Sequence, residues 1–155
     1  VHLKAAGDVK EQDVLDADGV IAGSPVQMSN VNWEMKKLID TVFGPLWMRD
    51  ALVGKVGAVF ATGGGFGNAG AGNEHVMISL LNNFAECGMI LIPLPKTTPG
   101  YAYGGLQWGP YARSAGVHME QTGIKDDMLE VAKEHGAHVA KASALLAGNT
   151  IFAKP

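Results

Sequence analysis

Short apolar segments alternate along this chain with segments whose apolar residues have helical spacing. The apolar runs that predict strands are residues 1–5, 19–23, 56–61 and 89–94. Apolar side chains at i, i+3, i+4 and i+7 predict helices over residues 32–43, 73–86 and 125–146. Strands without a polar face are typical of a parallel sheet that helices cover on both sides. The alternation therefore predicts an α/β protein with a doubly wound parallel sheet.

The segments between these elements are expected to be irregular. Residues 7–18 are polar and acidic and predict a surface connection, and Ser29 or Asn30 is the expected N-cap of the helix at 32–43. Residues 95–116 form a long loop rich in glycine, proline and tyrosine. A loop of this length in a compact domain more often serves as a functional lid or an assembly arm than as filler.

Composition and charge exclude several classes of protein. Hydrophobic residues make up 47% of the 155 residues and charged residues 17%, which excludes a disordered or coiled-coil chain and predicts a single domain over 1–155. The net charge of −3, without a lysine and arginine cluster, argues against a nucleic-acid partner. The longest apolar stretch, 89–94, is too short to insert across a membrane. A single cysteine, Cys87, favours a reducing compartment such as the cytoplasm.

The segment most indicative of a ligand is residues 62–72, which holds six glycines in eleven residues directly after a buried strand. Ligands of parallel α/β sheets bind at the carboxyl ends of the strands, and glycine lets backbone N–H groups approach a flat or anionic ligand closely. A flexible linker is the alternative. Gly65, Gly67 and Gly70 match the dinucleotide fingerprint, but the next strand runs into Pro95-Lys96 rather than an acidic residue. No Gly-Lys-Ser/Thr occurs, which excludes a Walker A loop.

A second candidate loop, residues 23–30, follows the strand at 19–23. It could be an ordinary strand-to-helix connection, but it leaves a neighbouring strand end and would form a pocket with residues 62–72. Trp47 could equally be a core residue. His135 and His138 are spaced for metal binding on one helix, but no third ligand is evident, so we predict no metal site.

Several segments together resemble the flavodoxin-like NAD(P)H:quinone oxidoreductases of the tryptophan-repressor-binding-protein (WrbA) type. The resemblance runs from Ala17 to Gly148. Its anchors are residues 17–25, Met35-Lys36 with Ile39-Asp40, Leu46-Trp47, residues 51–55 with the strand to Gly63, Cys87-Gly88-Met89 and Gly109-Pro110-Tyr111.

The resemblance implies a five-stranded parallel sheet in the order 2-1-3-4-5, an FMN cofactor and a homotetramer or dimer. It implies two-electron reduction of quinones by NAD(P)H, with ping-pong hydride transfer through flavin N5 and no catalytic side chain. The implied cofactor-binding residues are Ser24, Pro25, Val26, Gln27, Met28, Asn30, Thr62, Gly63, Gly64, Gly65, Phe66 and Gly67. The implied substrate-pocket residues are Trp47, Glu86 and Tyr111.

Some residues depart from the family pattern. Glu86 stands where the family often has a histidine beside the flavin, Lys96 where an aromatic residue is common, and Met28 where the family usually has an aromatic residue. In addition, no segment fits strand 1 or its Ser/Thr-rich phosphate loop, and residues 1–4 fit strand 2. We therefore expect the chain to be N-terminally incomplete.

Two other functions stay open. The first is a flavodoxin-like interaction or structural protein without bound flavin, which the absent phosphate loop and Glu86 would favour. The second is a one-electron flavodoxin carrier. Such carriers are strongly acidic, so the net charge of −3 makes this function the less favoured one.

Overall fold

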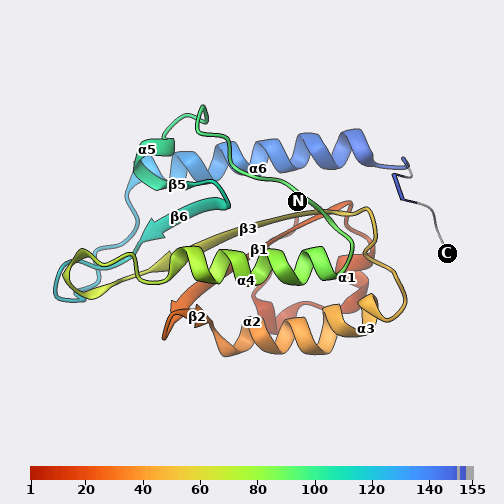
Figure 1. Ribbon diagram of the computed structural model, residues 1–155, viewed down its shortest axis with the longest axis horizontal. Helices are drawn as coiled ribbons and strands as arrows, with labels where there is room; N and C mark the ends of the chain where they lie inside the picture. The colour runs from red at the N-terminus through yellow and green to blue at the C-terminus, as the bar shows by residue number, and fades with distance from the viewer. Residues whose placement is uncertain (150, 153–155) are drawn as a thin grey trace.

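A central sheet with helices on both faces organises the computed structural model, which describes residues 1–149 and 151–152 (Figure 1). Two long parallel strands, β1 (Gly19–Gln27) and β3 (Val56–Gly63), form its centre. Two short strands continue the sheet beyond β3: β4 (Ile90–Leu91) pairs with the beginning of β3, and β6 (Gly109–Arg113) with its end. The position beside β3 is therefore filled by two separate strands, because the chain leaves β3 after β4 and pairs with it again only at β6.

Two short antiparallel strands extend the sheet at its edges. β2 (Asn30–Val31) pairs with the end of β1, and β5 (Gly105–Leu106) pairs with β6. The order across the sheet is β2-β1-β3-β6-β5, with β4 beside β3. The predicted α/β class with a parallel centre is confirmed.

Helices cover the two faces of the sheet unequally. A single long helix, α6 (Asp126–Leu146), lies across one face (Figure 1). The other face carries α4 (Asn73–Glu86), α2 (Trp33–Leu38), the π-helical turn η2 (Ile39–Phe43) and α3 (Gly44–Trp47). The larger core cluster is on the α4 face, where the rings of Phe43 and Phe84 meet edge to face with centroids 5.7 Å apart. On the α6 face, Val139 packs against the first half of β3.

The predicted helices at 73–86 and 125–146 are confirmed within one residue at each end. Gly88 has a φ of +70° just after α4, the left-handed conformation that ends many helices. The helix predicted at 32–43 is present as α2 and η2, but its N-cap is Asn32, whose Oδ1 accepts a hydrogen bond from Met35 N at 3.2 Å. The expectation of Ser29 or Asn30 was wrong because residues 27–30 form a β-hairpin turn instead.

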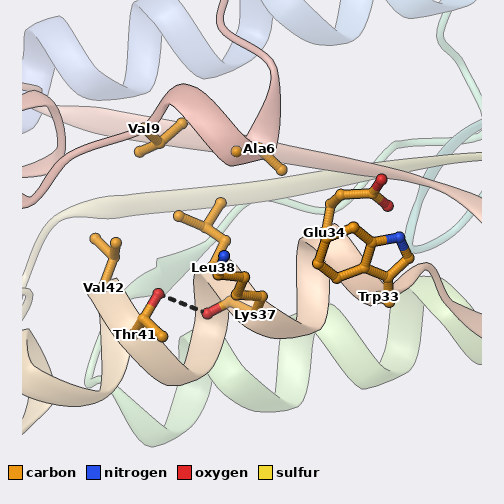
Figure 2. A pocket seen from close by; sticks show the side chains of 9 residues that line it. Ala6, Val9, Trp33, Glu34, Lys37, Leu38, Thr41 and Val42 are labelled. Carbon is orange, nitrogen blue, oxygen red and sulfur yellow. Dashed lines mark hydrogen bonds between the residues drawn. The ribbon is translucent and has the colours of Figure 1, made fainter.

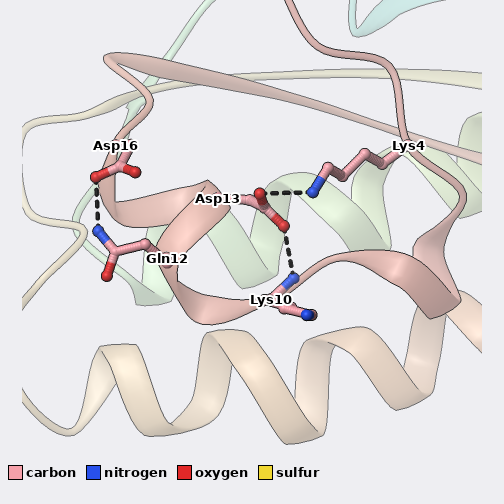
Figure 3. A network of polar contacts seen from close by, with 5 residues as sticks. All are labelled: Lys4, Lys10, Gln12, Asp13 and Asp16. Atoms are coloured by element: carbon pink, nitrogen blue, oxygen red, sulfur yellow. Dashed lines mark hydrogen bonds and ion pairs between the residues drawn. The ribbon is translucent and has the colours of Figure 1, made fainter.

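The N-terminal residues do not form the predicted strand. Residues 1–5 have no regular structure, and the surface connection predicted over residues 7–18 overlaps two short helices, η1 (Ala6–Asp8) and α1 (Glu11–Leu15). A strand needs a neighbour to pair with, and none of the described strands adjoins this segment. Instead, Asp13 accepts hydrogen bonds from Lys4 Nζ at 2.6 Å and Lys10 N at 2.9 Å, and the Lys4 bond is the main cause that lowers the pKa of Asp13 (Figure 3).

The predicted loop at 95–116 is partly regular. It contains a short helix, α5 (Tyr101–Gly104), and the whole of the strands β5 and β6. The sequence of β6 begins Gly-Pro, which reads as a turn, yet Ala61 and Tyr111 pair in register across the parallel ladder. Pairing with β3 outweighs the weak local preference of these residues for a strand.

One edge of β1 is largely free. Among the described residues, only β2 pairs with it there, at Val26 and Gln27, so that no strand adjoins the edge from Gly19 to Pro25. Next to this edge, Ile21 and Phe60 are 41% and 39% exposed. The free edge agrees with the expectation that the strand carrying the phosphate loop is not among the described residues.

Candidate functional site

Two turns meet at the carboxyl edge of the sheet. β1 and β3 are neighbours in register, with Pro25 opposite Thr62, so the segments that follow them leave the sheet side by side. Val26 Cγ2 lies 3.1 Å from the position that a Cβ atom would take on Gly63. Ser29 Cα lies 2.9 Å from the position that a Cβ atom would take on Gly72. The structure therefore brings the two predicted loops together, and their role as ligand contacts stays a prediction.

The first loop is a tight hairpin turn between β1 and β2, and not the ordinary strand-to-helix connection that was the alternative for residues 23–30. Met28 and Ser29, its two central residues, have φ values of +48° and +60°. Turns with two positive φ values match the twist of a hairpin but normally contain asparagine or glycine. Met28 is also almost fully exposed. Strained backbone of this kind is concentrated at functional sites.

Ser24 and Pro25 belong to β1 and support this turn from within the sheet. Ser24 is 1% exposed; its Oγ accepts from Asn32 N at 2.9 Å and donates to Pro25 O at 2.8 Å. Backbone groups of successive strand residues point to alternate sides, and Val56 N donates to Asp18 O, so the even-numbered residues of β1 face β3. The odd-numbered residues, Pro25 among them, point their backbone groups away from β3. Proline at such a position removes no hydrogen bond from the ladder. The side chain of Ser24 therefore holds the turn rather than lining its open side.

The second loop is the glycine-rich segment 62–72, which contains the single turn η3 (Phe66–Asn68). Gly65 has a φ of +74°, and a Cβ atom there would collide with the Ala69 carbonyl oxygen, so the loop closes on itself at this point. Gly67 has a φ of +64° but open space around it. Phe66 is exposed beside the loop.

Asn73, the first residue of α4, lies beneath the glycine-rich loop. Its side chain is 5% exposed; Nδ2 donates to Gly70 O at 3.1 Å, and the buried Oδ1 has no hydrogen-bond partner. A buried polar atom without a partner is uncommon, and a bound ligand is one of the groups that could supply the missing partner. The sequence reasoning missed Asn73, although a polar residue at a helix start directly after the loop was a signal that could have found it.

A hairpin after β6 closes the other side of the glycine-rich loop. Gly67 N donates to Val117 O at 2.9 Å, and the rings of Phe66 and His118 lie 6.1 Å apart. Met119 Cε lies 2.8 Å from where a Cβ atom at Gly64 would be. The glycine-rich loop is thus held between two turns, one after β1 and one after β6.

Two of the three predicted substrate-pocket residues, Trp47 and Glu86, lie away from the two loops, whereas Tyr111 pairs with Ala61 just before the glycine-rich loop. Trp47 and Glu86 line one cavity of about 250 Å³ together with Cys87. Glu86 is the last residue of α4, whereas the glycine-rich loop leads into its first residue, Asn73. Burial, and then the charge of Glu86, raise the pKa of the Cys87 thiol. Tyr111 lies on β6 and packs against the core cluster. A single chain therefore brings Trp47 and Glu86 together but does not bring them to the two loops.

A second, smaller hollow of about 80 Å³ separates the N-terminal segment from α2 and η2 (Figure 2). Ala6 and Val9 line one side, and Trp33 and Lys37 the other, with Lys37 Nζ 5.9 Å from the Trp33 ring centroid. None of the predicted cofactor residues lines it.

Comparison with known families identifies the chain. The sequence profile described as NADPH-dependent FMN reductase matches residues 5–98. The chain belongs to the NADPH-dependent FMN reductase family. The match covers both β1 and β3 and both loops of the candidate site.

Similar proteins agree with this family. A protein from Aquifex aeolicus (strain VF5) named flavodoxin is 37% identical over 91 residues, which are 59% of this chain and 46% of that protein. The chain thus spans about half the length of this curated relative.

Solved structures confirm the flavodoxin-like fold. A flavodoxin, WrbA-like protein from Agrobacterium tumefaciens superposes with a TM-score of 0.68 at 21% identity, covering 92% of this chain and 78% of that one. A flavodoxin from the domain Archaea superposes with a TM-score of 0.57 at 17% identity, covering 90% and 74%.

The site of this member of the FMN reductase family fits the ring of a flavin. The pyrimidine end of a flavin has carbonyl oxygens that accept hydrogen bonds and an N–H that donates one. The glycine-rich loop offers backbone N–H groups without Cβ atoms over them, and Asn73 Oδ1 is a buried acceptor without a partner. Beside β1, the described part of the chain contains no strand that could carry a phosphate loop.

Other kinds of site find no support within the described residues. No group of three or more histidine, cysteine, aspartate or glutamate side chains there is placed to hold a metal ion. No helix of residues 1–149 combines the length and the apolarity needed to cross a bilayer.

Proposed function

We propose that this chain forms the flavin-binding face of an FMN-dependent oxidoreductase of the WrbA type that transfers two electrons from NAD(P)H to a quinone. One observation carries the proposal: the strained turn at Met28-Ser29 and the glycine-rich loop meet at the carboxyl edge of the sheet, beside the unpartnered Oδ1 of Asn73. Membership of the FMN reductase family supports the choice of cofactor.

When bound, FMN supplies the redox chemistry by taking up hydride from NAD(P)H and delivering it to the acceptor. The task of the chain is to bind and orient. Backbone N–H groups of Gly64 and Gly65, which follow the last ladder residue of β3, would donate to the pyrimidine edge and stabilise the negative charge that develops there. Asn73 Oδ1 would accept from the ring N–H. Exposed Met28 and Phe66 would exclude water from the faces of the ring.

The substrate side of the site would need a second subunit. Trp47 and Glu86 lie together but away from the loops, so they reach a flavin only if they come from a neighbouring copy in a homotetramer or dimer. Light scattering coupled to size exclusion would test the assembly. A reducing compartment such as the cytoplasm is part of the same proposal.

The decisive experiment is titration of the purified chain with FMN, followed by quenching of flavin fluorescence. We expect saturable one-to-one binding and, with NAD(P)H and a quinone, parallel lines in double-reciprocal plots. A chain that stays colourless and leaves FMN fluorescence unchanged would contradict the proposal.

The second candidate is an interaction or structural protein without flavin. The free edge of β1, where the phosphate-bearing strand of the fold would lie, favours it. The same titration separates the two functions, because this candidate predicts no binding at any FMN concentration.

A further inference from the structure

Arg113, the last residue of β6, gathers carbonyl oxygens from two loops. Its Nη2 donates to Gly65 O at 2.6 Å and to Gly116 O at 3.3 Å, its Nη1 to Ala69 O at 3.2 Å, and its Nε to Ala115 O at 2.8 Å. Two of these oxygens belong to the glycine-rich loop and two to the hairpin that follows β6. One guanidinium therefore connects both loops.

The surroundings of Arg113 are those of a structural clamp and not of an ion pair. Within the described residues, no carboxylate lies within the 4.0 Å that would make a salt bridge with it. Two backbone hydrogen bonds flank the guanidinium, from Ser114 N to Gly63 O at 3.2 Å and from Gly67 N to Val117 O at 2.9 Å. The planar guanidinium has five donors in a fixed arrangement, so it can serve several carbonyls at once, which a lysine ammonium cannot do in the same geometry.

The two loop carbonyls that Arg113 binds are those at which the glycine-rich loop closes. Gly65 and Ala69 approach so closely that no Cβ atom fits at position 65. In a trans peptide the C=O and the following N–H point in opposite directions. Drawing the carbonyls of Gly65 and Ala69 toward the guanidinium therefore turns the N–H groups of Phe66 and Gly70 away from it.

We propose that Arg113 is a positioning residue that holds the glycine-rich loop in the shape that receives the flavin ring. This inference rests on the proposed flavin site. It assigns to Arg113 no contact with flavin or substrate. The rival explanation is that the positive charge alone attracts an anionic cofactor, in which case any cation at position 113 would serve.

Two substitutions in the full chain distinguish positioning of the loop by the hydrogen bonds of Arg113 from simple attraction by its positive charge. Arg113→Lys keeps the charge but loses the fork of donors, and Arg113→Met removes both. Arg49→Lys is the matched control, because Arg49 follows α3, which lies near the end of α4 opposite to the glycine-rich loop (Figure 1), and its guanidinium pairs with Glu11. The readouts are the Kd for FMN from fluorescence quenching and hydrogen exchange of residues 63–72 in the flavin-free protein, with circular dichroism to verify folding.

We expect both Arg113 variants to bind FMN at least tenfold more weakly and to exchange the amides of residues 63–72 at least tenfold faster, with Arg49→Lys unchanged in both. Wild-type affinity and exchange in Arg113→Lys would overturn the clamp. A wild-type chain that binds no FMN would refute the proposed function, while the exchange rates would still decide whether Arg113 orders the loop.

A measurement on the wild-type chain does not depend on how the variants fold. Exchange with increasing denaturant should show residues 63–69 and 114–117 losing protection together, because one side chain joins them. Independent opening of the two segments would contradict the inference.

Discussion

Met28 and Ser29 adopt left-handed backbone conformations that each cost about 1 kcal/mol or more for a residue with a Cβ atom. Nothing in their local sequence requires this. The cost is accepted because the hairpin turn positions the end of β1 against the glycine-rich loop, with Ser29 beside Gly72. The strain at these two residues is therefore a consequence of the site and a marker of it.

Asn73 provides the first test at the residue scale. If its Oδ1 accepts a hydrogen bond from the flavin ring, Asn73→Ala should weaken FMN binding by about twofold to tenfold, since a hydrogen bond contributes about 0.5–1.5 kcal/mol. Isothermal titration calorimetry would measure the change. Equal affinities for Asn73→Ala and the wild type would show that the atom is not used.

Gly65 and Gly70 form a matched pair for the glycine-rich loop. Gly65→Ala places a Cβ atom against the Ala69 carbonyl at a φ of +74°, whereas Gly70→Ala meets nothing within 4 Å. We expect at least a tenfold loss of FMN affinity for Gly65→Ala, with its melting temperature within a few degrees of the wild type because the loop lies beyond the packed core. The Gly70 variant should match the wild type; a loss in both would indicate a general effect of loop stiffness.

At the scale of elements, α6 contains an unusual buried residue. His135 lies in the middle of the helix, is 1% exposed, and neither ring nitrogen has a hydrogen-bond partner. Burial, with a smaller contribution from the charge of His138, lowers the pKa of His135 to about 4. The helix therefore packs on the sheet with a neutral imidazole, which the helical spacing of its apolar residues alone could not reveal.

This burial predicts how the stability of the fold depends on pH. An unfolded histidine has a pKa near 6.5, so between about pH 6.5 and 4 the unfolded chain binds the proton that the folded chain excludes. The free energy of unfolding should fall by about 3 kcal/mol as the pH is lowered through this window, at about 1.4 kcal/mol per pH unit. Urea unfolding at a series of pH values measures the slope.

The control for this prediction is the matched pair His135→Leu and His138→Gln. His135→Leu should remove most of the slope and be at least as stable as the wild type at pH 7, because it replaces two unpartnered buried nitrogens by an apolar side chain. His138→Gln should retain the slope. An unchanged slope in His135→Leu would assign the pH dependence to other groups.

At the scale of the whole molecule, the free edge of β1 decides which part of a cofactor the described residues can hold. The two loops surround the proposed ring-binding site, but no strand of the described residues lies beside β1 at the position where a phosphate loop would be. The apolar surface of Ile21 and Phe60 lies next to that edge. The described residues are thus suited to the isoalloxazine ring and offer little to the phosphate.

A comparison of FMN with riboflavin tests this division. Each hydrogen bond to a charged group contributes about 1.5–3 kcal/mol, so a built phosphate site would favour FMN by more than tenfold. We expect this chain to bind FMN and riboflavin with affinities that differ by less than about threefold, as measured by fluorescence quenching. A preference for FMN above tenfold would show that the chain contains a phosphate site.

Much of the fold could be predicted from local pattern. The buried strand at β3 and the helices α4 and α6 have strong periodicity and clear ends, such as Gly88 after α4, and they were predicted nearly to the residue. The spacing of apolar residues along a helix or strand reflects whether one of its faces or both are buried, so these elements can be identified from the sequence. The pairing of the two loops at one edge follows from the same reasoning, since parallel strands end together.

The remaining features depended on partners distant in the sequence. β6 is a strand only because β3 lies beside it, residues 1–5 are not a strand because no neighbour is available, and Pro25 fits within β1 because its nitrogen faces the free edge. Asn73 and Arg113 join the site through contacts with loop carbonyls that no spacing rule predicts. Local periodicity thus determined the layers of this protein, whereas hydrogen-bond pairing between segments far apart in the chain decided the ends of its strands and the shape of its candidate site.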